Sequence, residues 1–220
     1  AAAIKAYFAM NKKLFDMKAT PVRIFDGGNN IVVEAVITGT HKGPYMGLEA
    51  TNKPIGYQAA YWFMMKDGQV NKLYAYVDAA AMMGQLGALK GKMAKKVPKV
   101  LPAPTGKPQI IKGKADPAVM KAAEAMMKLK PTDKAYAKIV DENTVMQTAN
   151  GPTIKGLEAN KKMYAKMSKM FSDEKMETQA SLGVGPWAVA ATLETFKSKK
   201  AKKTIQMHAL YIGNFVGGKL

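Results

Sequence analysis

Residues 1–20 read AAAIKAYFAMNKKLFDMKAT, and residues 158–177 align with them without a gap as EANKKMYAKMSKMFSDEKME. The alignment pairs Tyr7 with Tyr164 and Asp16 with Asp173 at one constant offset. A repeat of this length indicates one structural unit used twice in the same chain. We therefore predict two imperfect copies of one fold.

A second pair of segments extends the repeat after a loop that is shorter in the second copy. Residues 53–70 read KPIGYQAAYWFMMKDGQV, and residues 203–220 read KTIQMHALYIGNFVGGKL. This alignment places Gln58 opposite His208, Tyr61 opposite Tyr211, and a turn glycine opposite another. The same order of elements is therefore expected in both copies.

Each copy begins with an amphipathic helix and continues into long strands. In both helices the apolar residues recur at the spacing that places them on one face. In the first copy this face consists of Ile4, Tyr7, Met10 and Leu14, and in the second of Met163, Tyr164, Met167 and Phe171. Strands are predicted over 17–26, 30–40, 55–66 and 69–77, and Asp67-Gly68 predicts a hairpin turn between the last two. Antiparallel neighbours follow from this order.

The flanking segments differ between the copies. The first copy ends in a strand and the helix AAMMGQLG at 80–87, whereas the second begins with an amphipathic helix over 117–129 and a shorter one after the Thr132 cap. The first copy is therefore expected to lack N-terminal helices and the second its last strand.

The segment between the copies, residues 90–116, holds eight lysines and four prolines. Such a composition does not form its own core, so we expect an extended linker of limited flexibility. A polybasic arm for nucleic acid or lipid is the alternative. The predicted organisation is a first repeat over 1–89, a linker over 90–116 and a second repeat over 117–220.

The composition excludes several chemistries. The 220-residue chain has no cysteine, so disulfides, thiolate zinc sites and cysteine nucleophiles are absent, and the two histidines stand apart from any metal-binding spacing. No metal is expected. The formal charge of +18 rests on lysine, with Arg23 the single arginine, which favours a solvated lysine surface over nucleic-acid recognition. No apolar run is long enough to cross a membrane.

Four motifs resemble the SnoaL-like polyketide cyclase branch of the NTF2-like superfamily. They are TGTHKG at 38–43, the TNKP loop at 51–54, the KDGQV turn at 66–70 and QLG at 85–87. The resemblance implies an α+β fold of two NTF2-like, cystatin-like cones, each a curved antiparallel sheet around helices with a pocket at its open end. It also implies ring closure or isomerisation by acid–base catalysis without a cofactor.

The resemblance further implies a histidine facing the pocket, which makes His208 the catalytic candidate in the second copy. A hydrogen-bonded core histidine is the alternative. At the equivalent place Gln58 orients a ligand but does not transfer protons at neutral pH. The expected ligand-pocket residues, which can equally serve as core, are Tyr7, Gln58, Tyr61, Met146, Tyr164, Phe171, Trp187 and Tyr211.

The family's acid on the last strand has no counterpart, because Asn71 and Lys72 occupy that place in the first copy. Of the other acids, Glu34 is expected on the outer sheet face, and Asp78 is expected to cap the helix that follows it. Glu194 alternates with Thr192 along its strand, and the sequence shows no partner for it.

Three functions follow from these observations. The first is a small-molecule binding protein for apolar or aromatic ligands, with acid–base catalysis as its extension and no cofactor. The second is a non-catalytic assembly module whose sheet faces pair in an internal pseudo-dimer or a homo-oligomer. The third, a lysine-mediated nucleic-acid or anionic-surface binder, is the least favoured. The tandem, lysine-rich arrangement also resembles exported or lipid-anchored bacterial proteins, with any signal upstream of Ala1.

Overall fold

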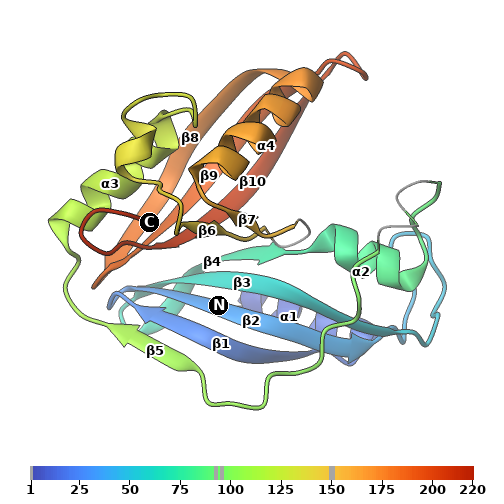
Figure 1. Cartoon of the computed structure of the whole chain (residues 1–220). Coiled ribbons are helices and arrows are strands. Elements are labelled where there is room, and N and C mark those ends of the chain that lie inside the picture. Colours follow the sequence, from blue (N-terminus) through green and yellow to red (C-terminus); the bar gives the residue numbers. More distant parts are fainter. Residues whose placement is uncertain (1, 92–93, 95–96, 149–151) are drawn as a thin grey trace. The chain divides into compact units, whose positions relative to one another are not determined.

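The computed structural model describes residues 2–91, 94, 97–148 and 152–220 (Figure 1). The chain divides into two compact units, Ala1–Ile111 and Lys112–Leu220. Each unit combines a curved antiparallel sheet with helices, so the predicted α+β class is confirmed. Among the described residues, no helix combines the length and the apolar character that a membrane span requires.

The first unit is a single sheet with the strand order β4-β3-β2-β1-β5. Its elements are α1 (Ala2–Phe15), β1 (Lys18–Asp26), β2 (Asn30–Thr40), β3 (Pro54–Lys66), β4 (Gln69–Val77), α2 (Ala79–Leu86) and β5 (Gln109–Lys112). Asp67 and Gly68 have positive φ of 51° and 71°, as the turn of a tight hairpin requires. The predicted strands and hairpin are therefore present.

The core of the first unit lies between the sheet and its helices. Every second residue of β3 from Tyr57 to Phe63 packs on this side, with Ala35 and Ile37 of β2 beside them. Phe15 closes α1 onto this core, and Ala81, Met82 and Leu86 contribute from α2. Strand alternation places the remaining β3 residues on the opposite face.

The expected linker does not run free of the first unit. The Leu101 N–H donates a hydrogen bond to the Gly56 carbonyl at 3.0 Å, and the Gln85 side chain donates to the carbonyls of Pro98 and Lys99. Residues 109–112 then add β5 beside β1. Extended backbone pairs readily with an open sheet edge, which explains why a segment without its own core is held in place.

The second unit holds a three-stranded sheet of order β10-β9-β8 and a two-stranded ribbon of β6 and β7. Its elements are α3 (Pro117–Lys128), η2 (Tyr136–Lys138), β6 (Val145–Met146), β7 (Ile154–Lys155), α4 (Leu157–Met170), β8 (Phe171–Val184), β9 (Trp187–Ser198) and β10 (Lys203–Asn214). Asp116 caps α3 through a 2.8 Å hydrogen bond from the Ala118 N–H.

The shorter helix predicted after Thr132 is present only as a 3-10 helix of three residues, and Thr132 is not its N-cap. The segment forms a turn in which Asp133 accepts a 2.7 Å hydrogen bond from the Lys130 N–H, followed by the short 3-10 helix η2. Asp133 satisfies a backbone donor locally and so competes with a regular helix start.

Candidate functional site

One face of the second unit's sheet is covered by helices. The β9 residues Ala188, Ala190, Thr192, Glu194 and Phe196 share that face because alternate strand residues point the same way. Ala188 packs in the core cluster of α3. At the other end, the Phe196 ring meets Phe171, the residue that follows α4, at a centroid distance of 4.8 Å. Glu194 therefore lies on the helix-covered face.

Glu194 is hydrogen-bonded to two side chains on this face. The Tyr211 hydroxyl donates to Glu194 Oε1 at 2.5 Å, and Thr192 Oγ1 donates to the same oxygen at 3.3 Å. Tyr211 lies opposite Ala190 on the neighbouring strand, in a regular register without a bulge. Thr192 is fully buried, and the other two side chains are half-buried. We call Thr192, Glu194 and Tyr211 the acid–phenol cluster.

The environment keeps the Tyr211 hydroxyl protonated, and so a hydrogen-bond donor, over the physiological range. Burial is the main cause that raises the pKa of Tyr211 far above its ordinary value, followed by its hydrogen bond to Glu194 and by the charges of Glu194 and Glu174. The Glu194 carboxyl group thus stands beside a neutral phenol that donates a hydrogen bond to it. Carboxyl groups and hydroxyl donors of this kind are the groups that acid–base catalysis uses.

The first unit carries phenols without such a carboxylate on its helix-covered face. Tyr57 and Tyr61 of β3 are 3% and 4% exposed, and Tyr7 and Tyr45 pack on the same core cluster. Burial, together with the phenol of Tyr7, raises the pKa of Tyr61 to about 12. Ile37 occupies the strand position that Glu194 holds in the repeat. The face is built to be apolar, with hydroxyl groups but no strand carboxylate.

Asp78 is an acid whose charge acts on Tyr57. Its Oδ1 accepts a 2.8 Å hydrogen bond from the Ala81 N–H and so caps α2, as predicted from the sequence. Burial, and next the phenol of Tyr61, raises the pKa of Tyr57, and Asp78 contributes the smallest part. Its structural role therefore accounts for its position.

The structure brings several of the expected pocket residues to the helix-covered faces. Tyr7 and Tyr61 pack in the first unit's core, and Tyr211 belongs to the acid–phenol cluster. Met146 packs against the α3 core cluster, and Phe171 contacts Phe196. Tyr164 is half-buried on α4.

Three predicted pocket residues lie on the opposite faces of their strands. Gln58 precedes Tyr61 by three positions, and His208 precedes Tyr211 by three, so regular alternation separates each pair. Both Gln58 and His208 are exposed. Trp187 is likewise an odd number of residues from Glu194. The expectation that His208 faces a pocket is therefore wrong in this structure.

Glu194 was missed as a site residue, although the sequence contained a signal for it. It lies an even number of positions from Ala190 and Thr192, so strand alternation places all three on one face. Its partner Tyr211 is brought to it by the β9–β10 register, which depends on the length of the hairpin loop.

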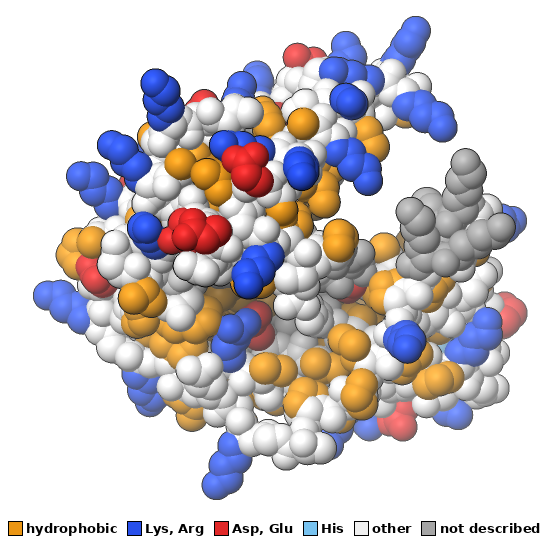
Figure 2. All heavy atoms as spheres, in the orientation of Figure 1, with side chains coloured by type: hydrophobic (Ala, Val, Ile, Leu, Met, Phe, Trp, Pro, Cys, Tyr) orange, Lys and Arg blue, Asp and Glu red, His pale blue; other side chains and the backbone are white. Residues whose placement is uncertain are grey.

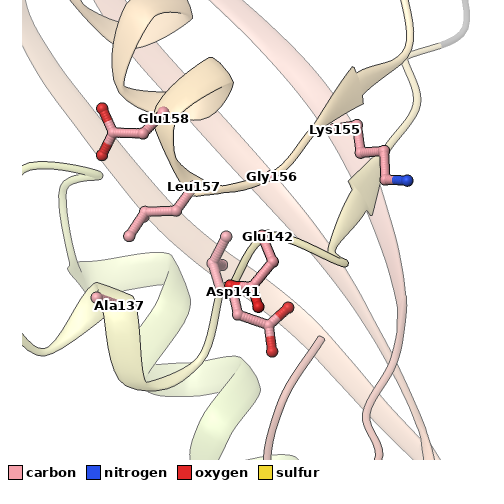
Figure 3. A pocket seen from close by; sticks show the side chains of 8 residues that line it. Ala137, Asp141, Glu142, Lys155, Gly156, Leu157 and Glu158 are labelled. Atoms are coloured by element: carbon pink, nitrogen blue, oxygen red, sulfur yellow. The ribbon is translucent and has the colours of Figure 1, made fainter.

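A separate hollow of about 520 Å³ lies at the beginning of α4 (Figure 3). It is lined by Ala137, Val140, Asp141, Glu142, Lys155, Gly156, Leu157 and Glu158. Asp141 pairs with Lys219 at 3.1 Å and Glu158 with Lys161 at 2.8 Å, while Figure 3 shows Lys155 turned away from the carboxylates of Asp141 and Glu142. Two of its acids thus have cationic partners, and we assign no chemistry to it.

Comparison with known proteins finds a family model that matches part of the chain. Residues 1–86 match the model of the SnoaL-like polyketide cyclase family, which confirms the resemblance over α1 to α2. No curated protein matches the chain.

Solved structures resemble part of the chain. A proposed SnoaL-like polyketide cyclase from Jannaschia sp. is 25% identical over 40% of this chain and 61% of its own, with a TM-score of 0.36. TsrD from Streptomyces laurentii is 24% identical over 40% and 63%, with a TM-score of 0.35. A Catenulispora acidiphila protein with a ketosteroid isomerase-like fold, in complex with trimethylamine, is 15% identical over 47% and 79%, with a TM-score of 0.40.

Proposed function

We propose that this chain binds apolar or aromatic carbonyl compounds on its helix-covered sheet faces, and that the second unit performs acid–base chemistry on them without a cofactor. The single observation that carries the catalytic part is the 2.5 Å hydrogen bond between the Tyr211 hydroxyl and Glu194. The family match of residues 1–86 supports small-molecule binding or cyclase-type and isomerase-type activity.

In the proposed reaction Glu194 is the base and Tyr211 the hydrogen-bond donor. Glu194 takes a proton from the carbon next to a carbonyl group, and the electron pair of the broken C–H bond moves onto the carbonyl oxygen. The Tyr211 hydroxyl turns from Glu194 to donate to this developing oxyanion. In a compound with a double bond next to the reacting carbon, return of the proton from Glu194 to the far carbon of the dienolate isomerises it. Attack of the enolate carbon on a second carbonyl instead closes a ring, and the alkoxide so formed takes the proton back from Glu194.

Thr192 serves to hold Glu194 in place. Its hydroxyl is fully buried, and it keeps one hydrogen bond to Glu194 Oε1 after Tyr211 has turned toward a ligand. The carboxylate therefore stays oriented during the reaction.

Hydrogen exchange next to a carbonyl tests the proposal without knowledge of the natural substrate. The probe is 2-tetralone in deuterated buffer, with deuterium uptake followed by NMR. We expect the whole chain to accelerate uptake, and Glu194→Gln to reduce the acceleration by about 10²–10⁴-fold, the usual contribution of a positioned base. Tyr211→Phe should reduce it as well, because the oxyanion then lacks its donor.

Gln206→Ala is the matched control, because Gln206 is exposed and lies on the face of the same sheet opposite to Glu194. It should leave the exchange rate unchanged. A rate that falls in His208→Ala but not in Glu194→Gln would overturn the assignment of the base. If the unmodified chain binds 2-tetralone but does not accelerate its deuterium uptake, the acid–base proposal is rejected. The protein would then be a binding protein without catalytic activity.

The lysine-mediated alternative has less support. In Figure 2 lysine and arginine side chains are scattered over the visible face and alternate with apolar and acidic groups, without one continuous basic patch. Nucleic-acid binding through lysine would weaken steeply with salt, which filter binding at two salt concentrations measures.

A further inference from the structure

The five-stranded and three-stranded sheets have four outer edges in the described residues, and three of these edges carry features that discourage strand pairing. On β8, two bulges interrupt the register, at Ser172/Lys175 and at Thr178/Ala180, and charged side chains follow closely along the strand. Strand β4 carries Lys72 and a bulge in its partner at Met64/Met65. Strand β5 is four residues long. Bulges, charges and short length are the usual protections of an open edge.

The fourth edge, on β10, has none of these protections. This strand is twelve residues long, its register with β9 contains no bulge, and Lys203 at its first position is its single lysine. It holds no proline. Within the part of the chain that the structure describes, β10 pairs with β9 alone. Ile205 and Met207 are 37% and 44% exposed along it.

The internal repeat shows what fits this edge. Strand β3 is the counterpart of β10 in the first unit, and its outer edge is paired with β4. There Ala59 lies opposite Val77 and Tyr61 opposite Ala75. The equivalent residues of β10 are Ala209 and Tyr211. The two edges therefore match at the positions that face the helices.

We propose that the open edge of β10 binds an extended polypeptide strand in the antiparallel direction. The strand has the chemistry of β4, with small or aliphatic residues at alternate positions, as Leu73, Ala75 and Val77 provide. In the bound strand, the residues at these alternate positions would face the helices of the second unit and lie next to Tyr211. The bound strand would therefore flank the acid–phenol cluster. This inference stands on the edge and the repeat, and does not depend on the proposed catalysis.

The hydrogen-bond pattern identifies the N–H groups available for pairing. Phe215 N–H donates to the Pro186 carbonyl at 2.7 Å, just beyond the Asn214–Trp187 pair. Because antiparallel ladders alternate, odd-numbered residues of β10 bond to β9 and even-numbered residues direct their N–H groups to the open edge. His208 and Gln206 belong to the second group. A proline at either position removes an outward donor and leaves the β9 ladder intact.

The test uses a synthetic peptide with the sequence of β4, Gln69–Val77, carrying a fluorescent label. Fluorescence anisotropy measures its binding to the whole chain. We expect saturable binding that weakens at least tenfold in His208→Pro and in Gln206→Pro, and that His208→Ala leaves unchanged. Circular dichroism establishes that each variant is folded, and the second proline variant serves if the first does not fold.

The side-chain alternation is tested on the peptide itself. A peptide with Ala75→Lys should lose binding, because the lysine would face the helices, whereas Tyr74→Lys should bind like the parent because Tyr74 faces the opposite side. Equal binding to the proline variants and the unmodified chain would overturn the proposal. A concentration-dependent dimer of the chain, lost in His208→Pro and not displaced by the peptide, would replace it with pairing between two copies.

Discussion

Tyr211 on β10 and Glu194 on β9 are joined by a 2.5 Å hydrogen bond, although 17 positions separate them in the chain. In the repeat, Tyr61 is the counterpart of Tyr211, whereas Ile37 is the counterpart of Glu194. The first unit thus keeps the phenol and lacks the carboxylate. The counterpart of Thr192 is Ala35, so two of the three positions of the acid–phenol cluster differ between the units.

This relationship predicts strong coupling between the two residues. Tyr211→Phe leaves Glu194 with Thr192 as its hydroxyl partner, and Glu194→Ile leaves the Tyr211 hydroxyl without its acceptor. We expect each variant to lower the free energy of unfolding by about 0.5–1.5 kcal/mol, because a half-buried polar group loses its hydrogen-bond partner. In the double variant both polar groups are gone, so the cost should be smaller than the sum of the two.

Urea denaturation of the four proteins measures this coupling in a double-mutant cycle. The matched cycle in the first unit combines Tyr61→Phe with Ile37→Val, where no such hydrogen bond exists, and should give additive costs. An additive result in the second unit would contradict the coupling and show that the hydrogen bond contributes nothing to stability.

The sequence predicted the elements of the first unit well because their signals are local. Alternation, the Asp67-Gly68 turn and the Asp78 cap each depend on a few neighbouring residues. The path of the linker could not be predicted, because Leu101 is held by Gly56, a residue distant in sequence. The turn after Thr132 was misread because Asp133 bonds to Lys130 in place of a helix start.

The site was predicted less completely for a different reason. The family resemblance directed attention to His208, whereas strand alternation, read from Tyr211, already placed His208 on the other face. Glu194 could be placed on the covered face by the same rule. Its hydrogen bond to Tyr211 could not, because it depends on the register of two strands joined by a loop.

Tyrosine burial in the first unit predicts a loss of stability at alkaline pH. The folded-state pKa of Tyr61 is about 12, raised mainly by burial, against about 10 for an unfolded chain. Between these values the unfolded chain has released the proton and the folded unit retains it. The contribution of neutral Tyr61 is therefore complete below about pH 10 and declines as the pH rises toward 12.

Comparison with Tyr61→Phe isolates this effect. The free energy of unfolding of the unmodified chain should fall relative to the variant by up to about 1.4 kcal/mol per pH unit in this interval. The lysines titrate nearby but are common to both proteins. Tyrosinate absorbance should rise at lower pH in urea than in buffer. Parallel stability curves for the two proteins would mean that Tyr61 is not held neutral by the fold.

The close contact between Gly56 and Leu101 predicts that a larger residue at position 56 would detach the segment that follows α2. A Cβ atom at Gly56 would lie 2.2 Å from the Leu101 carbonyl oxygen and 2.6 Å from its nitrogen, both of which are backbone atoms. Gly56→Ala should therefore displace this segment from β3 and cost about 1–3 kcal/mol, the usual effect of overpacking a well-packed site. Gly106→Ala is the matched control, since its Cβ would meet nothing within 4 Å.

Limited proteolysis should cut between Pro98 and Leu101 sooner in Gly56→Ala than in Gly106→Ala. Equal cleavage rates would show that the contact between Gly56 and Leu101 does not hold the segment, and that its path is set by β5 alone.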